Sequence, residues 1–227
     1  LEFASKILND ERMQVLAKKV TLVVSLYSPN PNTIRLVNQY AGEIIPAGVR
    51  FDILGDYGAR DISTQLDEWT ALLAKKANVG VISWLEFDGN MDLAQNWTRG
   101  IFDNISKAAQ KNIDTIYFNH WRVRGLEQNA KIAAQTCFDV QSGYDTIMNR
   151  YAADVFGKDC APLMRKAAEL LELATELCKQ KLYNIGFTGD WVYRYATDPP
   201  GYREEDLQLV RGLFDEAESA YLALAAS

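Results

Sequence analysis

The sequence is poor in histidine and cysteine. It has one histidine, His120, and three cysteines, Cys137, Cys160 and Cys178. An odd number of cysteines within helical patterns argues against a disulfide framework, so we expect buried free thiols in packing positions. With one histidine, no close cysteine pair and no HExxH motif, a metal site has little support. We therefore expect no metal and no other cofactor.

Basic residues and long apolar runs are also scarce. The 24 lysines and arginines are outnumbered by 30 aspartates and glutamates, and the formal net charge is −6. Nucleic-acid binding requires clustered lysine and arginine, so no nucleic-acid partner is expected. The longest apolar runs, such as VTLVVSLY, are far shorter than the roughly 20 residues that cross a bilayer, so no membrane span is predicted. Hydrophobic residues still make up 48% of the 227 residues, which suffices for a packed core.

Several sequence signatures are missing. The chain does not begin with methionine, and its first residues, LEFASKIL, already follow a helical pattern, which suggests a piece of a longer protein. Its location stays open, with secretion or the periplasm as the hypothesis. Neither GxSxG nor GxxxxGK[ST] occurs, so a serine triad and a phosphate loop are not supported. The sequons at Asn96 and Asn104 are of a kind that chance supplies.

Strand-like runs alternate with amphipathic helical runs up to about residue 140. The strands are predicted at 20–27, 49–54, 79–87 and 114–120. Successive strand-helix units predict a parallel sheet with right-handed crossovers. Beyond that point only helical spacing is found. We therefore predict two regions, with strand-helix units in 1–140 and a helical region in 141–227.

Alternating side chains on two strands favour half of an eight-stranded barrel over an open sheet. Trp84, Glu86 and Asp88 share one face of the third strand, and Asp52 and Asp56 share a face of the second. An open doubly wound sheet seldom carries inward carboxylates on two strands, whereas a barrel lumen becomes polar toward its C-terminal end. The predicted fold class is α/β, with four consecutive βα units of a TIM-type barrel, its second half, followed by an all-helical region.

The strongest candidate for chemistry is the segment WLEFDG at the end of the third strand. Glycoside hydrolysis uses two carboxylates, one as acid and one as base or nucleophile, and an aromatic ring offers an apolar face to a sugar. Glu86 and Asp88 are therefore the candidate catalytic pair, with Trp84 as a sugar contact. In the alternative interpretation, the two acids only mark the point where the strand leaves for solvent.

Two other strand ends supply candidate substrate-binding residues. YFNHWRVRGLE, after the fourth strand, combines polar donors, an aromatic ring and an acid, which suit a hydroxyl-rich or acidic ligand. A histidine at a strand end is more often structural, and Glu127 can equally stabilise the start of its helix. The candidate substrate-binding residues are Trp84, Asp56, Tyr57, Asn119, His120, Trp121, Arg122 and Glu127.

These segments resemble a known family. GVISWLEFDGN, YFNHWRVRGLEQNAKIAAQTCFD and YAADVFG are similar to the C-terminal half of carbohydrate-active (β/α)8-barrel glycoside hydrolases of the hexosaminidase-like and alpha-glucuronidase-like kinds, over roughly residues 50–160. The resemblance implies that Trp84, Glu86 and Asp88 line a sugar site. It places His120, Trp121, Arg122 and Glu127 at the neighbouring rim. The main hexosaminidases carry an adjacent Asp-Glu pair on an earlier strand, and no such pair ends a predicted strand here, so the principal acid can lie in an N-terminal barrel half.

The residues and the resemblance together predict a glycoside hydrolase, or part of one, that acts on a poly- or oligosaccharide. The alternative is a non-catalytic carbohydrate-binding or scaffold protein. In a third hypothesis the chain is inactive alone and requires the missing N-terminal barrel half as its partner, because an open half-barrel leaves two edge strands unprotected.

Overall fold

The structure is a computed structural model, and the chain in it divides into two compact units. Unit 1 comprises Leu1–Ser83 and Lys107–Phe118, and unit 2 comprises Trp84–Ser106 and Asn119–Ser227. The residues that the structure describes are 6, 10–12, 22–26, 49–54, 78–86, 94–120, 125–181 and 203–226.

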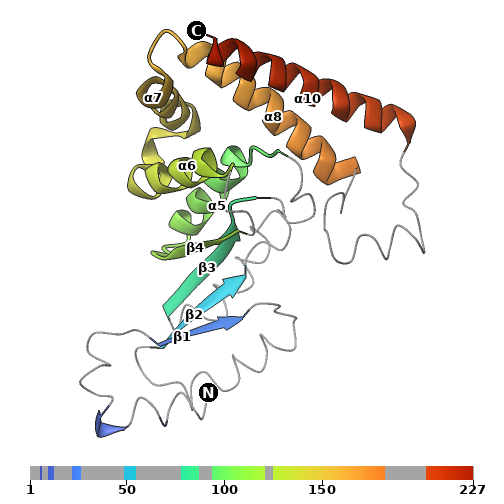
Figure 1. The fold of residues 1–227 in the computed structure, drawn as a ribbon. Coiled ribbons are helices and arrows are strands. Elements are labelled where there is room, and N and C mark those ends of the chain that lie inside the picture. Colours follow the sequence, from blue (N-terminus) through green and yellow to red (C-terminus); the bar gives the residue numbers. More distant parts are fainter. Residues whose placement is uncertain are drawn as a thin grey trace. The chain divides into compact units, whose positions relative to one another are not determined.

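Four strands form one sheet in the order β1, β2, β3, β4 (Figure 1). Strand β2 pairs in parallel with both β1 and β3. The strands are β1 Leu22–Leu26, β2 Val49–Leu54, β3 Asn78–Trp84 and β4 Ile116–Asn119. Their predicted positions are confirmed to within a few residues, because short apolar runs between turn-forming residues are a reliable strand signal.

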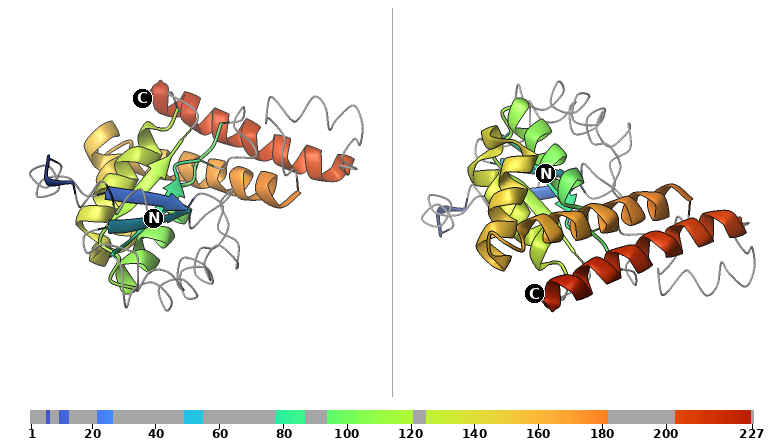
Figure 2. Two further views of the ribbon diagram at one scale, coloured as in Figure 1. Left: turned by 90° about the horizontal axis from the view of Figure 1, so that it is seen from below. Right: turned by 90° about the horizontal axis from the view of Figure 1, so that it is seen from above.

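Five α-helices are delimited in the described part of the chain. They are α5 Thr98–Gln110, α6 Glu127–Phe138, α7 Tyr144–Phe156, α8 Ala161–Lys181 and α10 Glu204–Ala225. Helix α7 is bounded by Gly143 and Gly157, whose φ angles of 77° and 85° are in the region that favours glycine. Helices α8 and α10 lie side by side and antiparallel in all views (Figure 1, Figure 2).

The core of unit 2 lies among its helices. Ile132 of α6, Ile147 and Met148 of α7, and Met164 of α8 are all buried in one cluster. A smaller cluster between α8 and α10 contains Cys178 and Val210. Full burial of an aliphatic side chain contributes about 1.5–3 kcal/mol, so these contacts hold the helices together.

The predicted fold class is wrong. Helices contain most of the described residues, and the four strands form an open sheet with β1 and β4 at its edges. Within the described ranges no barrel is formed. Among the described residues, a small sheet with mainly helical segments therefore replaces the predicted four βα units of a TIM-type barrel.

Asp52 shows why the inference of a barrel failed. Its carboxylate is only 2% exposed, but it does not line a lumen. The Arg50 side chain is on the same face of β2, and its Nε donates to Asp52 Oδ1 at 2.8 Å. Arg50 also donates to the hydroxyls of Thr115 and Tyr117. The inward carboxylate is thus compensated within unit 1, as a buried ion pair must be.

Gly80 on β3 gives the Asp52 carboxylate its space. A Cβ atom at position 80 would lie 2.1 Å from Asp52 Oδ1 and 3.4 Å from the Thr115 carbonyl oxygen. Glycine is needed here because of this close approach and not because of a special backbone angle. Any side chain at position 80 would displace Asp52 from Arg50.

We predict that Gly80→Ala lowers the free energy of unfolding by about 1–3 kcal/mol, the scale of an overpacked core. The matched control is Gly212→Ala on α10, where a Cβ atom meets nothing within 4 Å. Alanine favours a helix, so the control should be unchanged or stabilised by up to about 1 kcal/mol. Urea unfolding of both variants checks this, and equal stabilities would contradict the packing argument.

Candidate functional site

Strand β3 and strand β4 end next to each other. The Leu85 amide, one residue beyond β3, donates to the carbonyl oxygen of Asn119 at 3.0 Å within unit 2. This bond joins two of the segments that the sequence analysis singled out, Trp84 to Glu86 and Asn119 to His120. Neighbouring parallel strands end at the same edge of a sheet, which is why these segments meet.

Trp84 and Glu86 are buried. Their exposed fractions are 1% and 0%. The alternative in which Glu86 marks an exit into solvent therefore does not fit the structure. A carboxylate inside a protein is costly unless its surroundings compensate it, so its burial needs a structural or functional reason. A ligand could reach either side chain only if the surrounding residues opened.

Three of the other predicted site residues lie in the part of the chain that the structure describes. Asn119 is partly buried, and His120 is exposed directly after it. Glu127 is exposed in the first turn of α6, where a negative charge favours the helix. Five predicted site residues lie outside the described residues, namely Asp56, Tyr57, Asp88, Trp121 and Arg122.

Asn129 of α6 is a site residue that sequence reasoning missed. Its side chain is 1% exposed. Its Nδ2 donates to the Leu85 carbonyl oxygen at 2.7 Å, and its Oδ1 accepts from the Trp97 amide at 3.3 Å. Helical spacing places Asn129 on the same face as Ile132 and Ala133, and a polar residue on a buried face needs partners. That pattern could have identified Asn129 as a buried polar residue of α6, but not its partners.

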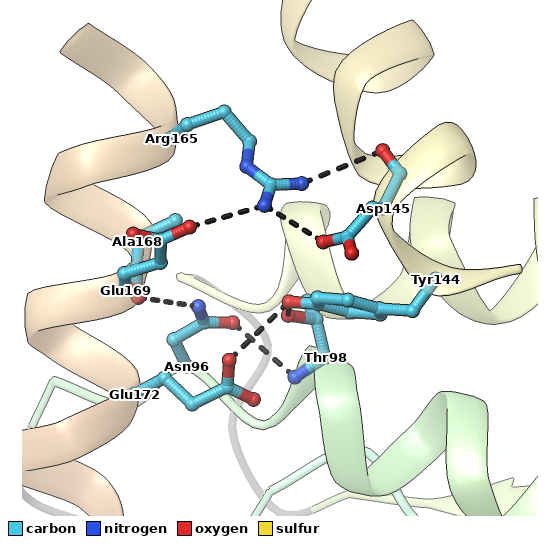
Figure 3. A network of polar contacts seen from close by, with 8 residues as sticks. All are labelled: Asn96, Thr98, Tyr144, Asp145, Arg165, Ala168, Glu169 and Glu172. Atoms are coloured by element: carbon cyan, nitrogen blue, oxygen red, sulfur yellow. Dashed lines mark hydrogen bonds and ion pairs between the residues drawn. The ribbon is translucent and has the colours of Figure 1, made fainter. Parts of the chain in front are cut away.

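Asn96 connects three helices of unit 2, and Figure 3 shows its bonds to Ala168 and Thr98. Its Nδ2 donates to the Ala168 carbonyl of α8 at 2.7 Å, and its backbone amide donates to Thr175 Oγ1 at 3.0 Å. Its Oδ1 accepts from the Thr98 amide of α5 at 3.2 Å and from Gln128 Nε2 of α6 at 3.3 Å. This sequon asparagine is buried and hydrogen-bonded, so a glycan cannot be attached without displacing these bonds.

Glu172 of α8 contacts the start of α5, and Figure 3 shows its bond to the side chain of Tyr144 on α7. Glu172 Oε1 accepts from the Arg99 amide at 2.8 Å, and Oε2 accepts from the Tyr144 hydroxyl at 3.3 Å. The Tyr144 hydroxyl also pairs with Thr98 Oγ1 at 2.8 Å. The first-turn amides of a helix lack partners within it, so the Glu172 carboxylate serves as a cap from a distant helix.

Burial changes the acidity of this pair. It raises the pKa of Glu172, against the opposing effects of the Arg99 amide and charge and of the Tyr144 hydroxyl. Burial likewise raises the pKa of Tyr144, and the nearby Glu172 charge raises it further. The Arg99 guanidinium lies 4.1 Å from the centre of the Tyr144 ring, where a cation is attracted to the ring face. The polar contacts thus reduce the cost of burying the ionised form of Glu172 without removing it.

Arg165 links α7 to α8 at the edge of this network. It forms ion pairs with Asp145 at 2.9 Å and with Glu169 at 3.0 Å (Figure 3). Both acids are largely exposed, so each pair contributes at most about 1 kcal/mol. We therefore infer that these ion pairs orient the Arg165 side chain between α7 and α8 and add little stability.

The described ranges contain no cluster of metal-ligating side chains, and their cysteines differ in exposure. No group of three His, Cys, Asp or Glu side chains there is placed to hold a metal ion. None of the three cysteines, all of which lie in the described ranges, forms a disulfide bond. Cys178 is buried as expected, and burial raises its pKa to about 11, whereas Cys137 is exposed, so the packing interpretation does not apply to it.

None of the helices that the structure describes combines the length and apolarity needed to cross a bilayer. Comparison with protein-family models, with curated proteins and with solved structures yields no match. The resemblance to glycoside hydrolases is therefore not supported by any relative.

We predict that Glu172→Gln is at least as stable as the parent at neutral pH. The folded chain holds the Glu172 proton more tightly than the unfolded chain, so this group stabilises the fold most below its unfolded pKa, near the ordinary value of 4.5. That contribution is lost as the pH rises through the higher folded pKa. Glutamine cannot titrate, so acidification should stabilise the parent relative to the variant.

Urea unfolding between neutral and acidic pH measures this difference. The matched control is Glu218→Gln, at an exposed carboxylate on α10, whose curve should follow the parent. A parent that loses stability relative to Glu172→Gln on acidification would contradict the account of the network.

Proposed function

We propose that the chain is a glycoside hydrolase, or part of one, that acts on a poly- or oligosaccharide at the exits of β3 and β4 in unit 2. The observation that carries the proposal is the hydrogen bond from the Leu85 amide to the Asn119 carbonyl. It joins the segment with Trp84 and Glu86 to the segment with His120, so an acid, an aromatic ring and an imidazole come from adjacent strand ends. The proposal does not depend on a barrel.

Glu86 and Asp88 are the proposed catalytic pair. One carboxyl group gives a proton to the leaving oxygen, while the other acts on the anomeric carbon or on a water molecule. Glu86 lies in a water-excluded position, where electrostatic interactions with a transition state are stronger than in solvent. His120 and Glu127 are exposed and suit contacts with sugar hydroxyls. The sequence adds Asp56, Tyr57, Trp121 and Arg122 as further proposed contacts.

One observation favours the second candidate, a non-catalytic carbohydrate-binding or scaffold protein. Glu86 is 0% exposed, so its carboxyl group cannot reach a glycosidic oxygen unless neighbouring residues open. The exposed His120 and Glu127 could contact a sugar without such a change. Binding without hydrolysis would follow if the opening never occurs.

We predict that Glu86→Gln and Asp88→Asn each lower turnover on the order of a hundredfold or more, the usual scale for an acid or base group. The assay uses the para-nitrophenyl glycosides of N-acetyl-β-glucosamine and α-glucuronic acid, which represent the two kinds of enzyme that the sequence resembles. Glu218→Gln is the matched control, because it makes the same chemical change at an exposed position of α10. If both variants fold and hydrolyse the glycosides at the parental rate, Glu86 and Asp88 are not the catalytic pair.

Calorimetric titration with N,N′-diacetylchitobiose and with a glucuronate-containing oligosaccharide separates the two candidates. Under the binding hypothesis, the parent binds sugar without hydrolysis and Glu86→Gln binds equally well. His120→Ala should then weaken binding about tenfold, which corresponds to roughly 1.4 kcal/mol of lost contact. If the chain neither binds nor hydrolyses these sugars, both candidates fail for this substrate class.

A further inference from the structure

We propose that Asn129 is a positioning residue that fixes the peptide unit leading into Glu86 and thereby sets the turnover of the site. This inference rests on the proposed function. It adds a residue from a different element, α6, to a site that the sequence places at strand ends.

The Leu85 backbone forms two hydrogen bonds. Its amide donates to the Asn119 carbonyl at 3.0 Å, and its carbonyl accepts from Asn129 Nδ2 at 2.7 Å. Both polar backbone groups of Leu85 are therefore held, the first by the end of β4 and the second by α6.

The Leu85 carbonyl belongs to the same planar peptide unit as the nitrogen and Cα atoms of Glu86. A hydrogen bond that fixes this carbonyl also fixes the plane from which the Glu86 side chain begins. Small changes in the position of a reacting group lower turnover strongly, by as much as about a hundredfold for 1 Å. The orientation of this peptide plane therefore sets the position of the proposed catalytic carboxyl group.

Asn129 is itself held in place. Its Oδ1 accepts from the Trp97 amide at 3.3 Å, so the amide group uses its donor and its acceptor on two different segments. The neighbouring Gln128 donates to Asn96 Oδ1, and Asn96 in turn bonds to the Ala168 carbonyl of α8. Asn129 therefore connects the exit of β3 to the packed helices of unit 2.

Thr136 provides the matched comparison on the same helix. It is as deeply buried as Asn129, but its Oγ1 donates to the carbonyl of Ile132 within α6 at 2.7 Å. Thr136→Val removes a buried hydrogen bond of α6 without changing a contact to the strand exit. A loss of turnover that comes only from weakening α6 should appear in both variants.

Asn129→Asp is the informative variant because it preserves the side-chain shape. An ionised aspartate still accepts from the Trp97 amide, but it faces the Leu85 carbonyl with an oxygen that cannot donate. Protonation on acidification restores a donor at that position. We expect kcat to fall about tenfold or more at neutral pH with KM changed less than about twofold, and to recover toward the parental value as the pH is lowered.

The experiment measures kcat and KM on the two para-nitrophenyl glycosides over a range of pH for the parent, Asn129→Asp and Thr136→Val. Hydrogen exchange reports in parallel on residues 84–86, where Asn129→Asp should lose protection while α7 and α8 keep theirs. If Asn129→Asp does not fold, Asn129→Ser repeats the test, with the same drop in kcat and without the recovery at low pH.

The outcomes distinguish this inference from the proposed function. An active parent whose folded Asn129 variant keeps its kcat would overturn the positioning role alone. An equal loss in Thr136→Val would also overturn it, because weakening of α6 would then explain the result. A parent that hydrolyses neither glycoside would overturn the proposed function, and the positioning role would fall with it.

Discussion

The hydrogen bond from Asn129 to the Leu85 carbonyl is the contact on which the candidate site depends. A buried carbonyl without a partner costs about 1–3 kcal/mol, so a chain that buries the exit of β3 must supply a donor there. Helix α6 supplies it, and Asn119 of β4 accepts from the Leu85 amide on the other side. These two bonds hold the residue directly before Glu86, whose side chain is buried.

A second network of buried polar side chains connects the helices of unit 2. Asn96 and Glu172 satisfy amides at the start of α5, and Tyr144 joins Glu172 to α7 (Figure 3). Apolar contacts alone would allow these helices several similar packing positions. Buried polar groups form their hydrogen bonds in only one of them. The raised pKa of Glu172 shows that burial still disfavours its charge. We infer that the network contributes more to the definition of the fold than to its stability.

The sequence predicts local elements of this chain well and predicts the assembly poorly. Strands and helices follow from short patterns, and Gly143 and Gly157 bound α7. Alternation also identified the inward face of β2, but it did not show that Arg50 compensates Asp52 on that face, and this omission led to the barrel. Trp84 and Glu86 stand out within one strand, whereas Asn129 reaches Leu85 across 44 residues, a distance that no local pattern spans.

The central claim is that the exits of β3 and β4 form a carbohydrate site. Hydrogen exchange of the chain with and without saturating N,N′-diacetylchitobiose or a glucuronate-containing oligosaccharide tests it most directly. The account predicts slower exchange on sugar binding at residues 84–86 and 119–127, with no change in α10. Unchanged exchange at both strand exits, or protection confined to α10, would contradict it.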